Sequence, residues 1–116
     1  MAEPDYPRDI PSLKEQWADY FDFGTAISVS EALSDSRMAF TARQFSIITP
    51  GNALKPDALL DIEASRSLVG SSGDETAVSI SMEGAAPILD FAKENGLKVH
   101  GHVLVWHQQT PEAFFH

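Results

Sequence analysis

Apolar and β-branched residues gather in three short runs along the chain, and stretches with the spacing of amphipathic helices separate these runs. The runs predict three strands, at residues 23–29, 45–49 and 98–106. Residues 50–52 are expected to break the second strand, and residues 70–74 to form the clearest loop. Strands separated by helices in this way are usually parallel and joined by crossovers, so the pattern predicts an α/β fold.

Four segments have helical spacing. They cover residues 12–21, 34–43, 57–68 and 82–95. Ser12 is expected to cap the first helix, together with a glutamate three residues later. Met38, Ala39 and Ala42 are expected to form the apolar side of the second helix. Gly96 stands where a left-handed residue would end the fourth helix.

Composition narrows the function classes. The 17 acidic and 8 basic side chains give a net charge of −9, which is unfavourable for binding a phosphate backbone. The absence of cysteine excludes disulfides, thiol nucleophiles and cysteine-based zinc sites. No apolar stretch approaches the ~20 residues of a membrane helix, and the N-terminus has no signal-peptide pattern. Residues 1–11, with prolines among charges, are expected to be a lead-in to one domain at residues 12–116.

Polar side chains directly follow the second predicted strand and end the third. Asn52 and Lys55 come after the second strand, and His102, Trp106 and His107 lie at the end of the third. Ligands of parallel α/β folds bind at this edge of the sheet. Strand parity places His102 and Trp106 on one face and His107 on the other. An indole platform for a pyranose ring, with polar groups for its hydroxyls, is typical of a sugar subsite; the alternative is that Trp106 and His102 only pack or cap the strand end.

A metal site is a second reading of the same region. His100 and His102 form a His-x-His pair on one strand face, an arrangement that barrel metallohydrolases use for two ligands. His107 lies on the opposite face, and the remaining histidine is the terminal His116. The spacing therefore gives this reading only a weak signal.

Three segments resemble one enzyme family. Residues 23–26, 44–57 and 101–111 are similar, in order and spacing, to the family 10 glycoside hydrolases, which are endo-β-1,4-xylanases. The most specific part is Gly-His-x-Leu-x-Trp-His-x-Gln, preceded by Asn-x-x-Lys. The resemblance covers about residues 12–116, and it implies that the chain supplies about the first three βα units of a (β/α)8 TIM barrel.

The resemblance also implies an activity and a set of binding residues. Family 10 enzymes cleave internal xylosidic bonds of xylan with retention of configuration. The motif residues that line the sugar subsites on the non-reducing side of the cleaved bond correspond to Asn52, Lys55, His102, Trp106 and Gln109. His107 also matches the motif, and its parity gives it a structural role behind the site. No cofactor and no metal is expected.

The chain departs from the family pattern at several positions. Gly51 and Ala53 stand where the family usually has glutamates, and His100 stands where arginine is common. Ala113 replaces an aromatic residue, and residues 61–81 are longer and more polar than usual.

The family's two catalytic carboxylates come from motifs of the Trp-x-Val-x-Asn-Glu and Thr-Glu-x-Asp types, and neither motif occurs in this sequence. We therefore expect the chain to carry substrate-binding residues but to be inactive alone. Its expected partners are xylan or xylo-oligosaccharides, the remainder of the barrel and an inserted or appended carbohydrate-binding module, without nucleic acid or membrane. The enzyme is expected to be secreted. A non-catalytic carbohydrate-binding domain and a metal-dependent hydrolase using His100 and His102 are the rival functions.

Overall fold

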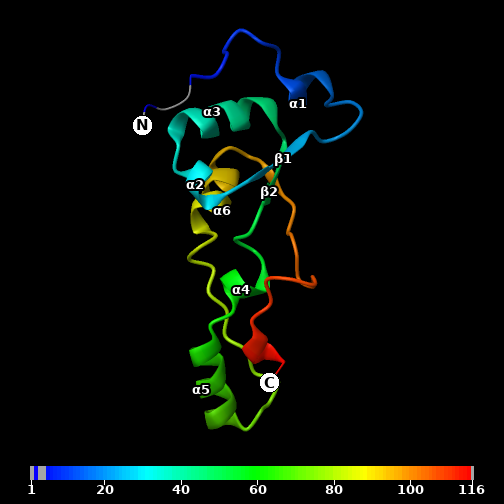
Figure 1. The fold of residues 1–116 in the computed structure, drawn as a ribbon. Helices are drawn as coiled ribbons and strands as arrows, with labels where there is room; N and C mark the ends of the chain where they lie inside the picture. Colours follow the sequence, from blue (N-terminus) through cyan, green and yellow to red (C-terminus); the bar gives the residue numbers. More distant parts are fainter. Residues whose placement is uncertain (1, 3–4, 116) are drawn as a thin grey trace.

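The computed structural model describes residues 2 and 5–115, and its centre is a three-stranded parallel sheet in the order β1-β2-β3. The strands are β1 (Gly24–Ile27), β2 (Ile47–Pro50) and β3 (Lys98–Val99). Figure 1 shows the sheet in the upper half of an elongated molecule whose longest dimension is 58 Å. The parallel βαβ order predicted from the sequence is confirmed.

Short helices connect and cover the strands. They are α1 (Leu13–Gln16), α2 (Val29–Ala32), α3 (Asp35–Gln44), α4 (Pro56–Leu59), α5 (Ile62–Ser72), α6 (Ala86–Glu94) and the 3-10 helix η1 (Glu112–Phe114). Among the described residues, no helix is long and apolar enough to cross a bilayer.

One face of the sheet forms the core. Ile27 and Ile48 point toward the helices and pack with Met38 of α3 and Ile88 and Ala92 of α6, all of them buried. A parallel strand alternates its side chains between two faces, so the neighbours of Ile27 and Ile48 lie on the other face. That other face is exposed along much of β1 and β3.

Glycine allows β1 and β2 to approach closely at their first pair of residues. A Cβ on Gly24 would lie 2.5 Å from Ile47 Cγ2, closer than side chains tolerate. Gly96 follows α6 with φ of 65°, as the sequence predicted, and the Leu97 amide donates to the Ala92 carbonyl at 2.8 Å.

The strand predictions are wrong in length. β3 ends at Val99 rather than at residue 106, and the chain bends at Leu104 and Val105. The strand parity used to pair His102 with Trp106 therefore does not apply. β2 covers Ile47–Pro50 rather than residues 45–49, so Pro50 is the last residue of the strand, and the Gly51 amide still donates to Ile27 O at 2.9 Å.

The helix at residues 57–68 is also predicted wrongly, since it is two helices. α4 ends at Leu59, and α5 begins after Asp61, whose carboxylate accepts from the Ala64 amide at 2.9 Å. Residues 70–72, expected in a loop, belong to α5, which ends at Gly73 with φ of 70°.

Two further differences concern burial and capping. In α3 the buried residues are Met38, Thr41 and Gln44, whereas Ala39 is exposed. The short helix α2, which periodicity alone does not reveal, begins with a capping box between Ser28 and Glu31.

The N-terminal lead-in lies against α3. Tyr6 stacks on Phe40 with ring centroids 4.7 Å apart, and Arg43 donates hydrogen bonds to the carbonyls of Pro7 and Arg8. Residues 1, 3 and 4 of the lead-in lie outside the described residues. Ser12 accepts from the Glu15 amide at the start of α1, as predicted.

Candidate sugar-binding site

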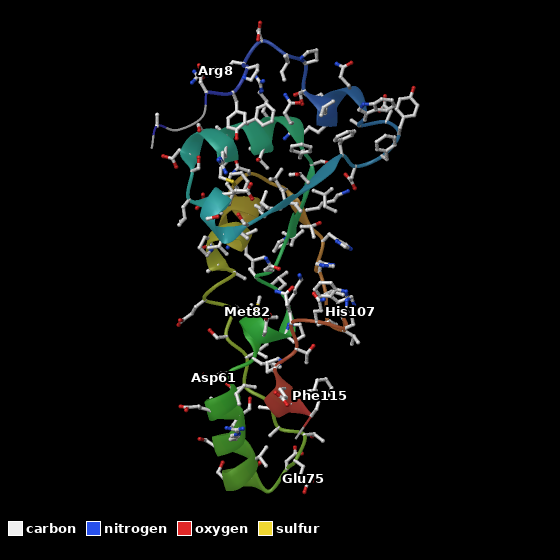
Figure 2. All side chains as sticks on the ribbon, viewed as in Figure 1. Arg8, Asp61, Glu75, Met82, His107 and Phe115 are labelled. Carbon is white, nitrogen blue, oxygen red and sulfur yellow. The ribbon has the colours of Figure 1, made fainter. Side chains whose placement is uncertain are left out.

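A buried lysine lies just beyond the end of β2. Lys55 is only 6% exposed and precedes α4, where Pro56 occupies the first helical position. A buried ammonium group is costly unless it is hydrogen-bonded, so its partners define the local structure. Figure 2 shows this part of the chain close to the segment that carries His107.

Two amide side chains hold the Lys55 ammonium group. Nζ donates to Asn52 Oδ1 at 2.8 Å and to Gln109 Oε1 at 2.6 Å, and Gln109 Nε2 donates to Asn52 Oδ1 at 3.2 Å. The three side chains thus form a closed cluster. Gln109 joins it from far along the chain, 54 residues after Lys55 and 57 residues after Asn52. The carboxyl-end segments after β2 and β3 meet here, as the topology predicted.

The backbone also joins these two segments. Gln109 has a φ of 56°, and its carbonyl accepts from the Asp57 amide at 3.0 Å, in the first turn of α4. This link fixes the side chain of Gln109 over Lys55. Sequence reasoning missed it, because no periodicity or composition signal marks a left-handed glutamine.

An indole ring lies over the ammonium group. Lys55 Nζ is 4.4 Å from the centroid of a Trp106 ring, within the range of a cation–π interaction. Trp106 is 37% exposed, so part of the ring remains open to a ligand. His107 is exposed and packs edge-on against Trp106 with centroids 4.8 Å apart.

His102 does not join this cluster. It lines a hollow of about 290 Å³ with Leu54, Leu59 and Leu104. Within residues 2 and 5–115, no hydrogen bond links its ring to Lys55. The structure therefore brings together four of the five predicted binding residues and leaves His102 beside them.

His100 and His102, the two candidate metal ligands, have different surroundings. His100 Nδ1 lies 3.4 Å from Thr49 Oγ1 on the sheet face opposite the helices, whereas His102 lines the hollow just described. Among the described residues, no group of three or more His, Cys, Asp or Glu side chains is arranged to hold a metal ion.

The arrangement can bind a polyhydroxylated ring. Lysine carries three N–H donors, and two of them are used by Asn52 and Gln109. The amide groups supply both donors and acceptors, and the indole supplies a flat apolar surface. Such a combination of few polar groups and an aromatic face is typical of small-molecule sites.

Comparison with known proteins relates the chain to one family of glycosyl hydrolases. The sequence profile of glycosyl hydrolase family 10 matches residues 12–116. Endo-1,4-beta-xylanase Y of Acetivibrio thermocellus is 39% identical over 103 residues, which cover 89% of this chain and 9% of that protein. Endo-1,4-beta-xylanase A of Thermotoga maritima is 35% identical over 109 residues, which cover 93% of this chain and 9% of that protein. The chain thus spans about a tenth of the length of these curated relatives.

Solved structures are similar as well. The CBM22-1–GH10 modules of Clostridium thermocellum endo-1,4-beta-D-xylanase 10B, complexed with xylohexaose, match with a TM-score of 0.75 and 36% identity, over 87% of this chain and 18% of that one. Xylanase B from Clostridium stercorarium F9 matches with a TM-score of 0.70 and 33% identity, over 91% of this chain and 27% of that one.

Proposed function

The chain belongs to glycosyl hydrolase family 10, and from this premise we propose that the complete protein is an endo-β-1,4-xylanase. It hydrolyses internal β-1,4-xylosidic bonds of xylan with retention of configuration. The three parallel strands and their crossover helices are the first βα units of the family's (β/α)8 barrel. Support for the substrate comes from the xylanase names of the relatives and from the similar structure that holds xylohexaose.

The observation that carries this proposal is the Lys55 cluster. A buried ammonium group lies between two amide oxygens and under an indole ring, at the carboxyl end of a barrel strand. Active sites of these barrels lie at that end of the strands. The remaining N–H of Lys55, the amide of Asn52 and the face of Trp106 then bind one xylose ring on the non-reducing side of the cleaved bond.

Binding on the non-reducing side positions the chain for cleavage elsewhere in the barrel. A retaining glycosidase needs two carboxylates about 5–5.5 Å apart, one as acid/base and one as nucleophile. The cluster described here consists of ammonium, amide and indole groups, so its role is orientation rather than bond breaking. We place the catalytic pair outside these 116 residues, with His102 and Gln109 completing the sugar contacts.

The proposed function implies partners and a location. Xylan or a xylo-oligosaccharide is the ligand, and the remainder of the barrel completes the site. The similar C. thermocellum structure contains a CBM22-1 module, which supports an additional carbohydrate-binding module here. Secretion stays a prediction.

The first test is the stereochemistry of hydrolysis. The complete protein, incubated with xylohexaose and followed by proton NMR, is expected to release the β-anomer first, as retention requires. The 116-residue chain by itself is expected to give no hydrolysis above background. Binding of xylohexaose without hydrolysis by the complete protein would instead support the carbohydrate-binding function, and activity that depends on added zinc would support the metal-dependent one.

The second test examines the cluster itself. In the complete protein, Lys55→Ala removes a charged hydrogen-bond donor and is expected to lower kcat/KM on xylohexaose roughly ten- to a hundred-fold, or about 1–3 kcal/mol. Trp106→Ala is expected to lower it as well, because the ring platform is lost. His100→Ala, directly after the neighbouring strand β3, is the matched control and is expected to lose less. A larger loss for His100→Ala than for Lys55→Ala would contradict the sugar subsite.

A further inference from the structure

A hollow lies between the N-terminal lead-in and α3. Its volume is about 370 Å³, which is within the range of small-molecule sites. Its lining consists of residues 5–8 of the lead-in and of Ser36, Ala39, Phe40 and Arg43 of α3. Figure 2 shows the lead-in, with Arg8 labelled, running over α3 and well away from the segment that carries His107. The hollow is therefore separate from the Lys55 cluster.

The hollow is on the side of α3 that faces away from the sheet. The buried residues of α3 are Met38, which packs in the core, and Thr41 and Gln44. With about 3.6 residues per turn, the four α3 residues that line the hollow lie on the opposite side of the helix. In a (β/α)8 barrel the helices form the outer ring, so the strands that complete the barrel lie on the sheet side of α3. The outward face that carries the hollow is thus at the surface of the barrel.

The lead-in is held on α3 by a ring contact and by its backbone. Tyr6 stacks on Phe40 with ring centroids 4.7 Å apart, and the Arg43 guanidinium donates to the carbonyls of Pro7 and Arg8. These two bonds use two of the five N–H donors of an arginine. Because Arg8 contributes its carbonyl to this anchor, its side chain is not needed to hold the lead-in in place.

Asp5 and Arg8 line the hollow with exposed, oppositely charged side chains. Within residues 2 and 5–115, no hydrogen bond or ion pair engages either side chain. An anion is repelled by Asp5 and a cation by Arg8, so together they favour a neutral ligand with both hydrogen-bond donors and acceptors. Hydroxyl groups have both properties. The rings of Tyr6 and Phe40 add an apolar surface, so the lining matches a pyranose ring.

We propose that this hollow is a second xylan-binding site, which holds part of the polysaccharide outside the catalytic cleft. Arg8 and Asp5 bind ring hydroxyls, and the Tyr6–Phe40 pair contacts the C–H surface of a xylose. One polysaccharide chain occupies the cleft and the hollow together, so the second contact raises the overall affinity through effective concentration. The choice of xylan as the ligand rests on the proposed function.

The test compares a long and a short substrate of the complete protein. Insoluble xylan reaches both sites, whereas cleavage of xylohexaose needs the cleft alone, and the readout is the ratio of the initial rates on dilute xylan and on xylohexaose. Arg8→Ala removes the side chain and keeps the anchoring carbonyl, so it is expected to lower this ratio roughly two- to tenfold, the range of one lost hydrogen bond. Ala39→Gln fills the hollow from the exposed face of α3 and is expected to lower the ratio at least as much.

Arg37→Ala is the matched control. It removes an arginine of the same helix that lies outside the hollow and is 3.7 Å from a carboxylate oxygen of Glu31, and its ratio is expected to equal that of the wild type. Adsorption to insoluble xylan then measures binding directly, in complete protein that carries Lys55→Ala to weaken the cleft. Adding Arg8→Ala to this protein is expected to raise the dissociation constant for xylan by the same two- to tenfold factor.

The failure of this inference differs from the failure of the proposed function. If the ratio or the adsorption is unchanged in both Arg8→Ala and Ala39→Gln, the second site is wrong and the proposed function stands. If Arg8→Ala slows the cleavage of both substrates equally, the side chain acts through the fold, and the second site is also wrong. If the complete protein cleaves neither substrate, the proposed activity is wrong, and adsorption of the variants to xylan decides the inference alone.

Discussion

The molecule has two regions of different construction. The first, called the body, comprises the sheet with α2, α3 and α6, and the second, called the arm, comprises α4, α5 and η1 (Figure 1). The body contains nearly all of the buried apolar residues, such as Ile48 and Ile88 at 0% exposure. In the arm, none of the three helices buries a residue. Apolar packing therefore stabilises the body, whereas the arm depends on interactions other than a buried core.

Local hydrogen bonds hold the arm. Asp61 caps α5, and Ser65 Oγ donates to the Asp61 carbonyl at 2.6 Å while it accepts from the Ser79 amide at 2.9 Å. An antiparallel bridge between Leu60 and Ile80 closes the base of the segment. Such bonds are each worth about 1 kcal/mol and depend little on the rest of the fold. The Lys55 cluster lies at the junction, so a packed body positions it and a hydrogen-bonded arm flanks it.

The largest expected effect is on the free energy of unfolding, when a large apolar side chain is truncated in the body and in the arm. Ile48→Ala in the body leaves a cavity under α3 and α6 and is expected to lower the free energy of unfolding by about 2–5 kcal/mol. Leu68→Ala in α5 removes a side chain that is already 43% exposed and is expected to cost less than about 1 kcal/mol. Urea denaturation of the complete protein measures both. Equal losses would mean that the arm has a packed core of its own, and the comparison would fail.

The same contrast explains what the sequence could predict. In the body, the β-branched runs and the left-handed Gly96 after α6 mark elements that packing then stabilises, and the predicted parallel order is confirmed. In the arm, α5 buries no residue, so apolar spacing carried no information about where it begins and ends. The N-terminus of α5 is marked by its cap residue Asp61, and its C-terminus by the left-handed Gly73. Each is a single residue within a polar segment, so the sequence did not single it out.

The candidate site divides in the same way. Asn52, Lys55 and Gln109 come together because parallel strands bring their carboxyl ends to one edge, which topology predicts. The place of His102 could not be predicted, because β3 ends at Val99 and the alternation of faces ends with it. The buried Gln44 of α3, whose Oε1 accepts from the Leu13 amide at 2.9 Å, was missed for a related reason: polar residues carry no hydrophobic period.

A smaller effect compares the N-caps of the two regions. Ser28→Ala removes the hydroxyl that caps α2 in the body and is expected to lower the global free energy of unfolding by about 0.5–2 kcal/mol. Asp61→Ala removes the equivalent cap of α5 in the arm. Its effect is expected to be faster amide hydrogen exchange within residues 64–72, with little change in the urea midpoint, because local unfolding of the arm does not require unfolding of the body.

Glu63→Gln is the control for the second variant, since it removes a negative charge from the first turn of α5 without removing the cap. Exchange in residues 64–72 is expected to change less than for Asp61→Ala. If Asp61→Ala lowers the urea midpoint as much as Ser28→Ala does, the arm unfolds together with the body and the two regions form one cooperative unit.

The smallest expected effect concerns two carboxylates whose pKa values are both lowered by hydrogen bonds. The backbone amide and then the hydroxyl of Ser28 lower the pKa of Glu31 in the body, and the hydroxyl and then the amide of Thr76 lower the pKa of Asp74 beside the arm. A carboxylate whose pKa is lowered by folding stabilises the folded state at pH values above its unfolded pKa of about 4. This contribution is lost as the pH falls through the folded pKa.

Thr76→Val removes the hydroxyl that lowers the pKa of Asp74 most, so carboxyl NMR titration is expected to give Asp74 a pKa nearer the ordinary value. Because Asp74 is exposed and outside the body, urea stability between pH 6 and pH 3 is expected to follow the same curve as the wild type, whereas Ser28→Ala flattens that curve. A change in the pH dependence for Thr76→Val as large as for Ser28→Ala would show that the Asp74 turn is coupled to the body.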